Sequence, residues 1–232
     1  MVARSSFVAV NAFEDIPVKA LYTTKKKKKS EGDYSSFNLG LHVEDDPQSV
    51  LQNRLALEKH LSKKVVFMNQ THSDKVILVD KNDVCECEKM LEGKTPVSLG
   101  VEADGIVTCD STVALAVLTA DCLPLLMTTK EGNVIAAVHC GWKGVYSNII
   151  KNAVALIREF SKSEIYAYLG PCIGPESFEV GSELLDKFQS ILPEASRAFT
   201  KKGNGKYLCS LPLLTRMQLE NVGVSKVAES KV

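Results

Sequence analysis

The amino-acid sequence predicts a mixed α/β (α+β) fold in which helices cover mixed sheets. Short runs rich in Val, Ile, Leu and Ala alternate along the chain with longer runs of helical periodicity. Apolar residues make up 45% of the 232 residues, which is enough to build a buried core. No linker rich in Pro, Gly or Ser interrupts the chain, so we expect residues 1–232 to form a single domain.

The first part of the chain predicts a strand, a helix and two further strands. The segment 20–24 (ALYTT) is strand-like. Asp46 is placed to cap a helix that begins at Pro47 and continues to Leu61, because proline suits the first helical position. Short strands follow at 65–70 and 76–80, joined by the polar turn THSDK.

The middle of the chain is its most apolar part and predicts strands that are buried on both faces. These strands are expected at 103–109, 113–122, 124–129 and 134–140. The periodicity then indicates one helix at 144–160, a strand at 165–171 and a helix that stops at Pro193. Asn204-Gly205 predicts a hairpin, and a last helix is expected to end at Gly223.

Charge and hydropathy exclude several classes of partner. Lys plus Arg and Asp plus Glu both number 28, which argues against a basic nucleic-acid binder. No apolar run reaches the roughly 18 residues that cross a bilayer, and the start lacks the apolar region of a secretory signal. We therefore expect no nucleic-acid or membrane partner and a cytoplasmic location. Lys25–Lys29 predicts an exposed, mobile loop, or a segment that closes over phosphate.

The seven cysteines are an odd number, and the chain is too long to need disulfide staples. We therefore expect most of them to be reduced thiols. Cys85 and Cys87 form a C-x-C pair among charged residues, for which an exposed loop is favoured over a metal pair.

Two of the four histidines and one cysteine occupy positions where binding or catalytic residues are expected. His72 lies in the polar turn, and His139 and Cys122 each end an apolar run; ligands of open α/β sheets bind beyond the carboxyl ends of strands. The three form a plausible zinc set with one open position, or a thiolate–imidazole pair for covalent chemistry. His60 is expected at the surface, and His42 is assigned equally to a cleft and to a structural role.

The turn GWKG at 141–144 has two interpretations. Its backbone N–H groups and Lys143 predict an anion site, whereas a tight turn with Trp142 in the core explains it equally well. The two glycine-rich nucleotide-binding motifs, G-x-x-x-x-G-K-[ST] and G-x-G-x-x-G, are absent. The cytidine-deaminase signature, H-x-E followed by P-C-x-x-C, is absent as well.

Ordered blocks of the chain resemble the laccase-domain purine nucleoside phosphorylase family, whose members were once labelled polyphenol oxidases. The resemblance covers about residues 20–223 and rests on FNLGLHVEDDPQSVLQNR, NQTHSDKV, ADGIVT, LTADCLPLL, AAVHCGWKG and LGPCIGPESFEVG. It implies a catalytic metal set of His72, Cys122 and His139 that binds Zn²⁺. It also implies phosphorolysis of adenosine, inosine, guanosine and methylthioadenosine, deamination of adenosine, and a four-layer α/β/β/α sandwich similar to the cytotoxic necrotizing factor deamidases.

The candidate partners of substrate and phosphate are Arg54 and Lys143, which lie in these blocks, and Arg216, which lies where the family has an N-R-x-Q-L segment. The chain departs from the family pattern at TTKKKKKSEG, where T-x-R-x-G-G is usual, at Lys143 in place of arginine, and at Cys209 in place of aspartate. At each of these three departures, the resemblance leaves open whether the segment keeps the function that it has in the family.

A multicopper oxidase needs a copper cluster with about eight histidines in addition to those of its blue-copper site. This chain has four histidines and no H-x-H pair, which argues against that function. Copper is an alternative to zinc only as a single ion. Two other functions stay open: a thiol hydrolase or amidase built on Cys122 and His139, including one that edits cell-wall precursors, and a non-catalytic partner-binding module.

Overall fold

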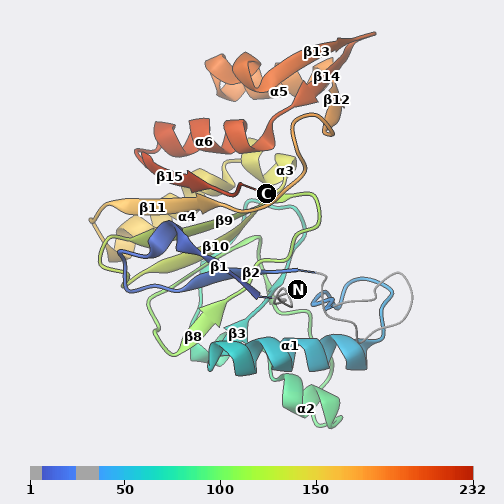
Figure 1. The fold of residues 1–232 in the computed structure, drawn as a ribbon, viewed down its shortest axis with the longest axis vertical. Coiled ribbons are helices and arrows are strands. Elements are labelled where there is room, and N and C mark those ends of the chain that lie inside the picture. The colour runs from blue at the N-terminus through green and yellow to red at the C-terminus, as the bar shows by residue number, and fades with distance from the viewer. Residues whose placement is uncertain (1–6, 25–36, 232) are drawn as a thin grey trace, which may run out of the picture.

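A six-stranded mixed sheet lies at the centre of the molecule (Figure 1). The computed structural model describes residues 7–24 and 37–231, so the predicted Lys25–Lys29 loop lies outside the described residues. The strand order is β15-β11-β9-β10-β7-β5, with parallel pairing at β15–β11 and β7–β5 and antiparallel pairing between. The bounds are β5 Val76–Leu78, β7 Gly105–Thr108, β9 Leu123–Thr129, β10 Ile135–Cys140, β11 Ile165–Leu169 and β15 Lys226–Glu229.

Helices cover one face of this sheet and enclose the largest apolar cluster. Leu125, Val138 and Leu169 point from the sheet into this cluster, where Ile150 and Leu214 meet them from the helices. The alternation along each strand explains the pattern, because every second side chain faces the helices. The helices on this side are α3 Trp142–Tyr146, α4 Ile149–Phe160, α5 Ser182–Ile191 and α6 Leu211–Asn221.

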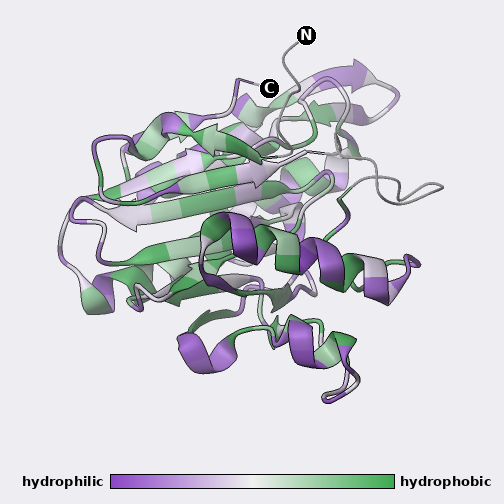
Figure 2. Cartoon of the chain, turned by 60° about the horizontal axis from the view of Figure 1, so that its bottom comes forward, coloured by the Kyte–Doolittle hydropathy of each residue, from purple (hydrophilic) through white to green (hydrophobic). Residues whose placement is uncertain are grey.

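The opposite face of the sheet carries Ile106 and Ala137, which pack on the smaller sheets. Figure 2 shows apolar residues running along the strands and mixed residues on the helices that cover them. Three two-stranded sheets lie here: β1–β2, β3–β8 and β4–β6. Their bounds are β1 Phe7–Val10, β2 Ala20–Thr23, β3 Lys64–Val66, β4 Met68–Asn69, β6 Val101–Glu102 and β8 Val113–Leu115.

Helix α1 (Pro47–Leu61) begins as the sequence predicts. The Asp46 carboxylate accepts hydrogen bonds from the backbone N–H groups of Gln48 and Ser49, and Pro47 takes the first helical position. The short helix α2 (Cys87–Leu91), which the sequence does not predict, packs beside α1 at the bottom of Figure 1.

A three-stranded sheet at the other end of the molecule packs on α5 (Figure 1). Its order is β12-β14-β13, with bounds β12 Glu179–Gly181, β13 Phe199–Gly203 and β14 Lys206–Cys209. Asn204 and Gly205 both have positive φ, at 51° and 72°, as a two-residue hairpin turn requires. The predicted hairpin is therefore confirmed.

The single helix predicted at 144–160 is wrong. The chain forms α3 and then α4, because Asn148 between them adopts a left-handed conformation with φ 72°. Asparagine tolerates this region better than most residues. The break separates a short helix directly after His139 from the long helix that covers the sheet.

The strand predicted at 113–122 is also too long. Strand β8 ends at Leu115, and the following residues form a loop up to Cys122. The backbone N–H and carbonyl of Leu118 bond the side chain of Gln70 rather than a neighbouring strand. Cys122 therefore comes directly before β9 and does not end a strand.

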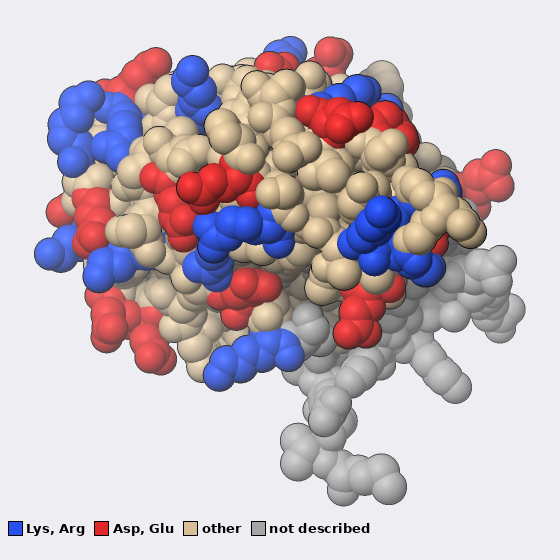
Figure 3. Space-filling model, turned by 90° about the horizontal axis from the view of Figure 1, so that it is seen from above, with Lys and Arg blue, Asp and Glu red and all other residues tan. Residues whose placement is uncertain are grey.

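Both signs of charge are spread over the face seen in Figure 3, in line with the equal numbers of cationic and anionic residues. Within residues 7–24 and 37–231, no helix has the length and apolar character that a membrane span needs. The mixed α/β class predicted from the sequence is confirmed.

A candidate metal centre of two histidines and a cysteine

Cys122 and His139 are brought together by the antiparallel pairing of β9 and β10. Cys140 lies opposite Leu123 and His139 opposite Pro124, so the residue before β9 lies next to the end of β10. The expectation that both residues follow carboxyl ends of strands is wrong for Cys122. In an antiparallel pair, however, the start of one strand lies beside the end of its neighbour, and the two side chains still meet.

His72 reaches the same place on a loop that wraps around Asp104. The Asp104 carboxylate accepts hydrogen bonds from the backbone N–H groups of Thr71 at 3.1 Å, His72 at 3.0 Å and Ser73 at 2.7 Å, and from the Ser73 hydroxyl at 2.6 Å. This loop holds His72 in the left-handed region, with φ 62°. Such strain in a non-glycine residue persists only where its surroundings enforce it, as these bonds do.

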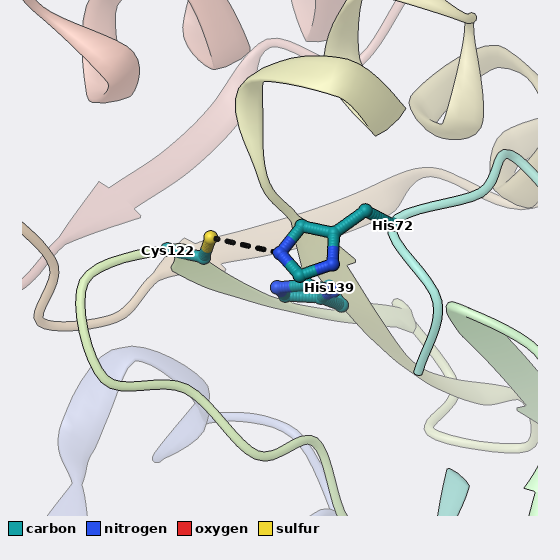
Figure 4. A group of neighbouring side chains, drawn as sticks. All are labelled: His72, Cys122 and His139. Carbon is teal, nitrogen blue, oxygen red and sulfur yellow. Dashed lines mark hydrogen bonds between the residues drawn. The ribbon is translucent and has the colours of Figure 1, made fainter. Parts of the chain in front are cut away.

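The three side chains point toward one another (Figure 4). One donor atom from each of His72, Cys122 and His139 lies within 4.8 Å of the others, and Cys122 Sγ lies 3.9 Å from His72 Nε2. The imidazole rings of the two histidines meet edge to face, with centroids 4.7 Å apart. Two ligands of one tetrahedral zinc ion would lie about 3.5 Å apart, so this nitrogen and sulfur set fits such an ion after small side-chain shifts.

Gly141 closes the space behind the group. A Cβ atom at this position would lie 3.1 Å from both Cys122 Sγ and His72 Cδ2, which is tighter than ordinary contacts. A larger residue would therefore require Cys122 or His72 to shift by a few tenths of an ångström. Glycine is the residue that leaves them room to converge.

His139 forms a buried ion pair with Asp104. His139 Nδ1 lies 2.8 Å from Asp104 Oδ1, and both side chains are almost inaccessible to solvent. Burial acts to lower the pKa of His139, but the hydrogen bond to Asp104 and the neighbouring Cys122 sulfur outweigh it and raise the pKa to about 9. The carboxylate fixes the imidazole orientation and leaves Nε2 for the candidate metal or a substrate.

The pKa values of the two other groups shift downward. Burial acts to raise the pKa of Asp104, yet the bonds from His139, Ser73 and the Thr71 backbone hold it well below its usual range. The pKa of His72 is lowered by partial burial, by His139 and by the charge of Lys143, against the pull of Asp104. His72 therefore stays neutral more readily, which is the form that binds a metal.

Gln70 joins the two loops that carry His72 and Cys122. Its Nε2 donates to the Leu118 carbonyl at 2.7 Å, and its Oε1 accepts from the Leu118 N–H at 2.8 Å. Sequence reasoning missed both Gln70 and Asp104. Each belongs to a motif that the resemblance uses, NQTHSDKV and ADGIVT, and that was the available signal.

The three predicted anion partners occupy different places. Lys143 is exposed on α3, and its charge acts on His72. Arg54 is buried, donates to the Leu39 carbonyl at 2.9 Å and lies over the ring of Phe67. Arg216 bonds the Val227 carbonyl and the Glu229 carboxylate. A role of these three in substrate binding stays a prediction.

The remaining histidines lie away from the group. His60 is exposed, as predicted, and stacks on Phe7 with ring centroids 3.9 Å apart. His42 is exposed as well. Among the described residues, no further group of His, Cys, Asp and Glu has the spacing of a metal site.

The exposed loop predicted for Cys85 and Cys87 is wrong, because both thiols are buried. The charged neighbours Glu86 and Glu88 point to solvent, while the alternate positions face the core beneath α1. All seven cysteines are free thiols, as predicted.

Comparison with known proteins places the chain in a family. Residues 19–232 match the family model described as multi-copper polyphenol oxidoreductase laccase. The purine nucleoside phosphorylase of Haemophilus influenzae is 34% identical over 226 residues, covering 94% of this chain and 86% of the relative.

Solved structures agree with this match. A crystal structure of a Neisseria meningitidis protein aligns with a TM-score of 0.81 and 35% identity, over 97% of this chain and 87% of that one. The Bacillus licheniformis protein YfiH aligns with a TM-score of 0.85 and 28% identity, over 100% and 88%. The chain therefore belongs to the laccase-domain family, in which relatives carry the name purine nucleoside phosphorylase.

Proposed function

We propose that this chain is a purine nucleoside phosphorylase that also deaminates adenosine, at a Zn²⁺ site formed by His72, Cys122 and His139. Its substrates would be adenosine, inosine, guanosine and methylthioadenosine, cleaved with phosphate. The observation that carries the proposal is the convergence of these three donor atoms within 4.8 Å of one another. The names of its relatives supply the substrate class.

The protein's own residues would hold the zinc ligands in place. Asp104 holds His139 through Nδ1, so His139 Nε2 would face the zinc ion. Gln70 keeps the two loops of the site together. When bound, a zinc ion supplies Lewis acidity, which activates water and stabilises developing negative charge.

Lys143 is the favoured partner for phosphate. It is exposed, and its charge reaches the candidate centre, whereas Arg54 and Arg216 donate to groups within the chain. A cavity of about 350 Å³ is lined by Trp142 and Lys187, although none of the three donor residues lines it. Trp142 offers an aromatic face to a purine base, and both lysine ammonium groups lie within 6 Å of its ring.

Product analysis tests this proposal. Purified protein is incubated with inosine or adenosine, with and without inorganic phosphate, and the products are identified by mass. We expect ribose 1-phosphate and free base only when phosphate is present, and inosine from adenosine in either case. Cys122→Ala should abolish both reactions, because they share one site. Deamination that survives in Cys122→Ala while phosphorolysis is lost would overturn the shared site.

The arrangement of Cys122, His139 and Asp104 favours a second candidate function, a thiol amidase. A nucleophile, a base and a carboxylate that orients the base are the parts that such catalysis needs. The proposed four-layer sandwich and its likeness to the necrotizing factor deamidases would suit this reaction. An amidase would act without phosphate and would form a covalent acyl group on Cys122, which intact mass measurement detects.

A further inference from the structure

Cys85 and Cys87 form a buried dithiol outside the candidate metal centre. Their side chains are 5% and 0% exposed, and the two Sγ atoms lie 3.2 Å apart. Both belong to the apolar cluster between α1 and β3, which does not include Cys122. Two thiols in contact inside a protein are placed to react with each other.

The backbone between the two cysteines turns sharply and places both side chains on one side. Glu86 has φ −82° and ψ 59°, which is the conformation of an inverse γ-turn. The Cys85 N–H is anchored to the Val65 carbonyl at 3.2 Å, and Cys87 begins α2. The contact between the sulfurs is therefore built into the chain path.

A buried cation lies against one of the two sulfurs. Arg54 is 1% exposed, and its Nη1 donates to Cys85 Sγ at 3.5 Å. The nearby Glu58 carboxylate pairs instead with Lys64 at 3.0 Å. A buried guanidinium requires a compensating anion, and a Cys85 thiolate supplies one at this contact.

The electrostatics separate the roles of the two thiols. The bond from Cys87 lowers the pKa of Cys85 against the opposing effect of burial, and the Arg54 charge adds to this. The bond to Cys85 and burial raise the pKa of Cys87. Cys85 therefore ionises more readily than Cys87, in keeping with its contact to Arg54.

Cys85 also borders a cavity, although it is only 5% exposed. Cys85 and Met90 line a cavity of about 350 Å³, together with Gly100 and Val101. This volume admits a peroxide molecule, whereas Cys87 is 0% exposed and does not line the cavity.

We propose that Cys85 and Cys87 form a reversible oxidation site that takes hydrogen peroxide as its substrate. The Cys85 thiolate attacks one peroxide oxygen, so that an S–O bond forms, the O–O bond breaks and hydroxide leaves. The Cys87 sulfur then attacks the sulfenic acid. The S–S bond forms, the S–O bond breaks, and the departing hydroxide takes the Cys87 proton as water. Starting from the Cys85 thiolate and the Cys87 thiol, the pair loses two electrons and one proton, and the peroxide becomes one hydroxide ion and one water molecule.

Peptide mass analysis of the wild-type protein tests the proposal without any substitution. Cleavage by trypsin after Lys81 and Lys89 releases residues 82–89, NDVCECEK, which contain both thiols and no other cysteine. The folded protein is treated with dilute peroxide, its remaining thiols are alkylated, and it is digested. We expect this peptide to lose two hydrogens and to regain both alkylation sites after dithiothreitol.

Two substitutions and one internal control sharpen the result. Cys87→Ser should stop at a sulfenic acid on Cys85, which dimedone traps, and Cys85→Ser should leave Cys87 unoxidised. The exposed Cys109, whose pKa burial raises, should react on the order of tenfold more slowly than Cys85. The proposal would be overturned by any of three results. The peptide 82–89 could keep two free thiols after peroxide treatment, its thiols could react no faster than Cys109, or one of them could form a disulfide with another cysteine.

Discussion

Asp104 and His139 form a buried ion pair beneath the candidate metal centre, with His139 Nδ1 2.8 Å from Asp104 Oδ1. The same carboxylate accepts three backbone N–H groups of the loop that carries His72. One side chain therefore orients both histidines, although it contributes no atom to the group of three donors.

Asp104→Asn should weaken zinc binding about 10- to 100-fold, the usual effect of removing a partner behind a ligand. The amide cannot accept all the bonds that the carboxylate accepts, so the His72 loop should also loosen. Competition with a chromogenic chelator measures the affinity. Asp110→Asn is the matched control, because Asp110 also accepts backbone bonds, from Lys81 and Thr112, at a surface turn. Equal affinities in the two variants would contradict the role of Asp104.

The ion pair should make the stability of the metal-free protein depend on pH in both directions. The pKa of His139 rises from about 6.5 when unfolded to about 9, so its contribution is complete below pH 6.5 and is lost as pH rises through 9. The pKa of Asp104 is lowered, so its contribution is present above about pH 4 and is lost as pH falls below that value.

We therefore expect the stabilisation to be largest between about pH 4 and 6.5. Urea unfolding with a chelator present, followed across pH, measures it. Asp104→Asn should flatten the profile by an amount on the order of 2 kcal/mol. A profile that Asp104→Asn leaves unchanged would show that the pair does not titrate as described.

Gln70→Ala should lower kcat while changing KM little, because it removes both bonds that hold the Cys122 loop to the His72 loop. Each bond contributes on the order of 1 kcal/mol, so a modest loss of unfolding free energy is expected as well. Zinc affinity gives a second reading, since looser loops should release the ion faster. Gln52→Ala, at an exposed position of α1, is the control. An equal loss in both variants would assign the effect to stability alone.

Gly141→Ala should disturb the candidate centre without unfolding the protein. The new methyl group would lie 3.1 Å from Cys122 Sγ and from His72 Cδ2, so one ligand must move. We expect weaker zinc binding and lower activity at nearly unchanged thermal stability. Gly174→Ala provides the control, because its Cβ would meet nothing within 4 Å. Full zinc affinity in Gly141→Ala would show that the space behind the ligands is not needed.

Copper loading should saturate at a single ion per chain. The four histidines are too few for a multicopper cluster, and two of them lie outside the group of donors. Elemental analysis after dialysis measures the ratio, and absorption spectroscopy should show no intense blue band. Four copper ions bound per chain would restore the oxidase function that the family description names.

The sequence predicted the three donor residues because each follows or precedes an apolar run, which is a local pattern. The residues that position these donors were not predictable in the same way. Asp104 acts through three backbone N–H groups whose directions depend on the fold of a distant loop. The break at Asn148 was missed because the apolar periodicity continues across it.

The burial of Cys85 and Cys87 shows a further limit of sequence reasoning. Charged residues at Glu86 and Glu88 suggested a surface segment, yet period-two alternation hides the cysteines and exposes the acids. A window that averages hydropathy over this segment cannot separate the two faces. The Asn204-Gly205 turn, in contrast, was predictable because its backbone angles depend on those two residues alone.

The pairing of β9 with β10 predicts an order in which the centre assembles. A hairpin between neighbouring strands closes early in folding, because its loop is short, and it unites Cys122 with His139 at once. His72 joins only after the more distant parallel pairing of β5 with β7 has formed. We therefore expect a refolding chain to hold two ligands together before the third arrives, and metal captured at that stage would favour the completion of the remaining sheet.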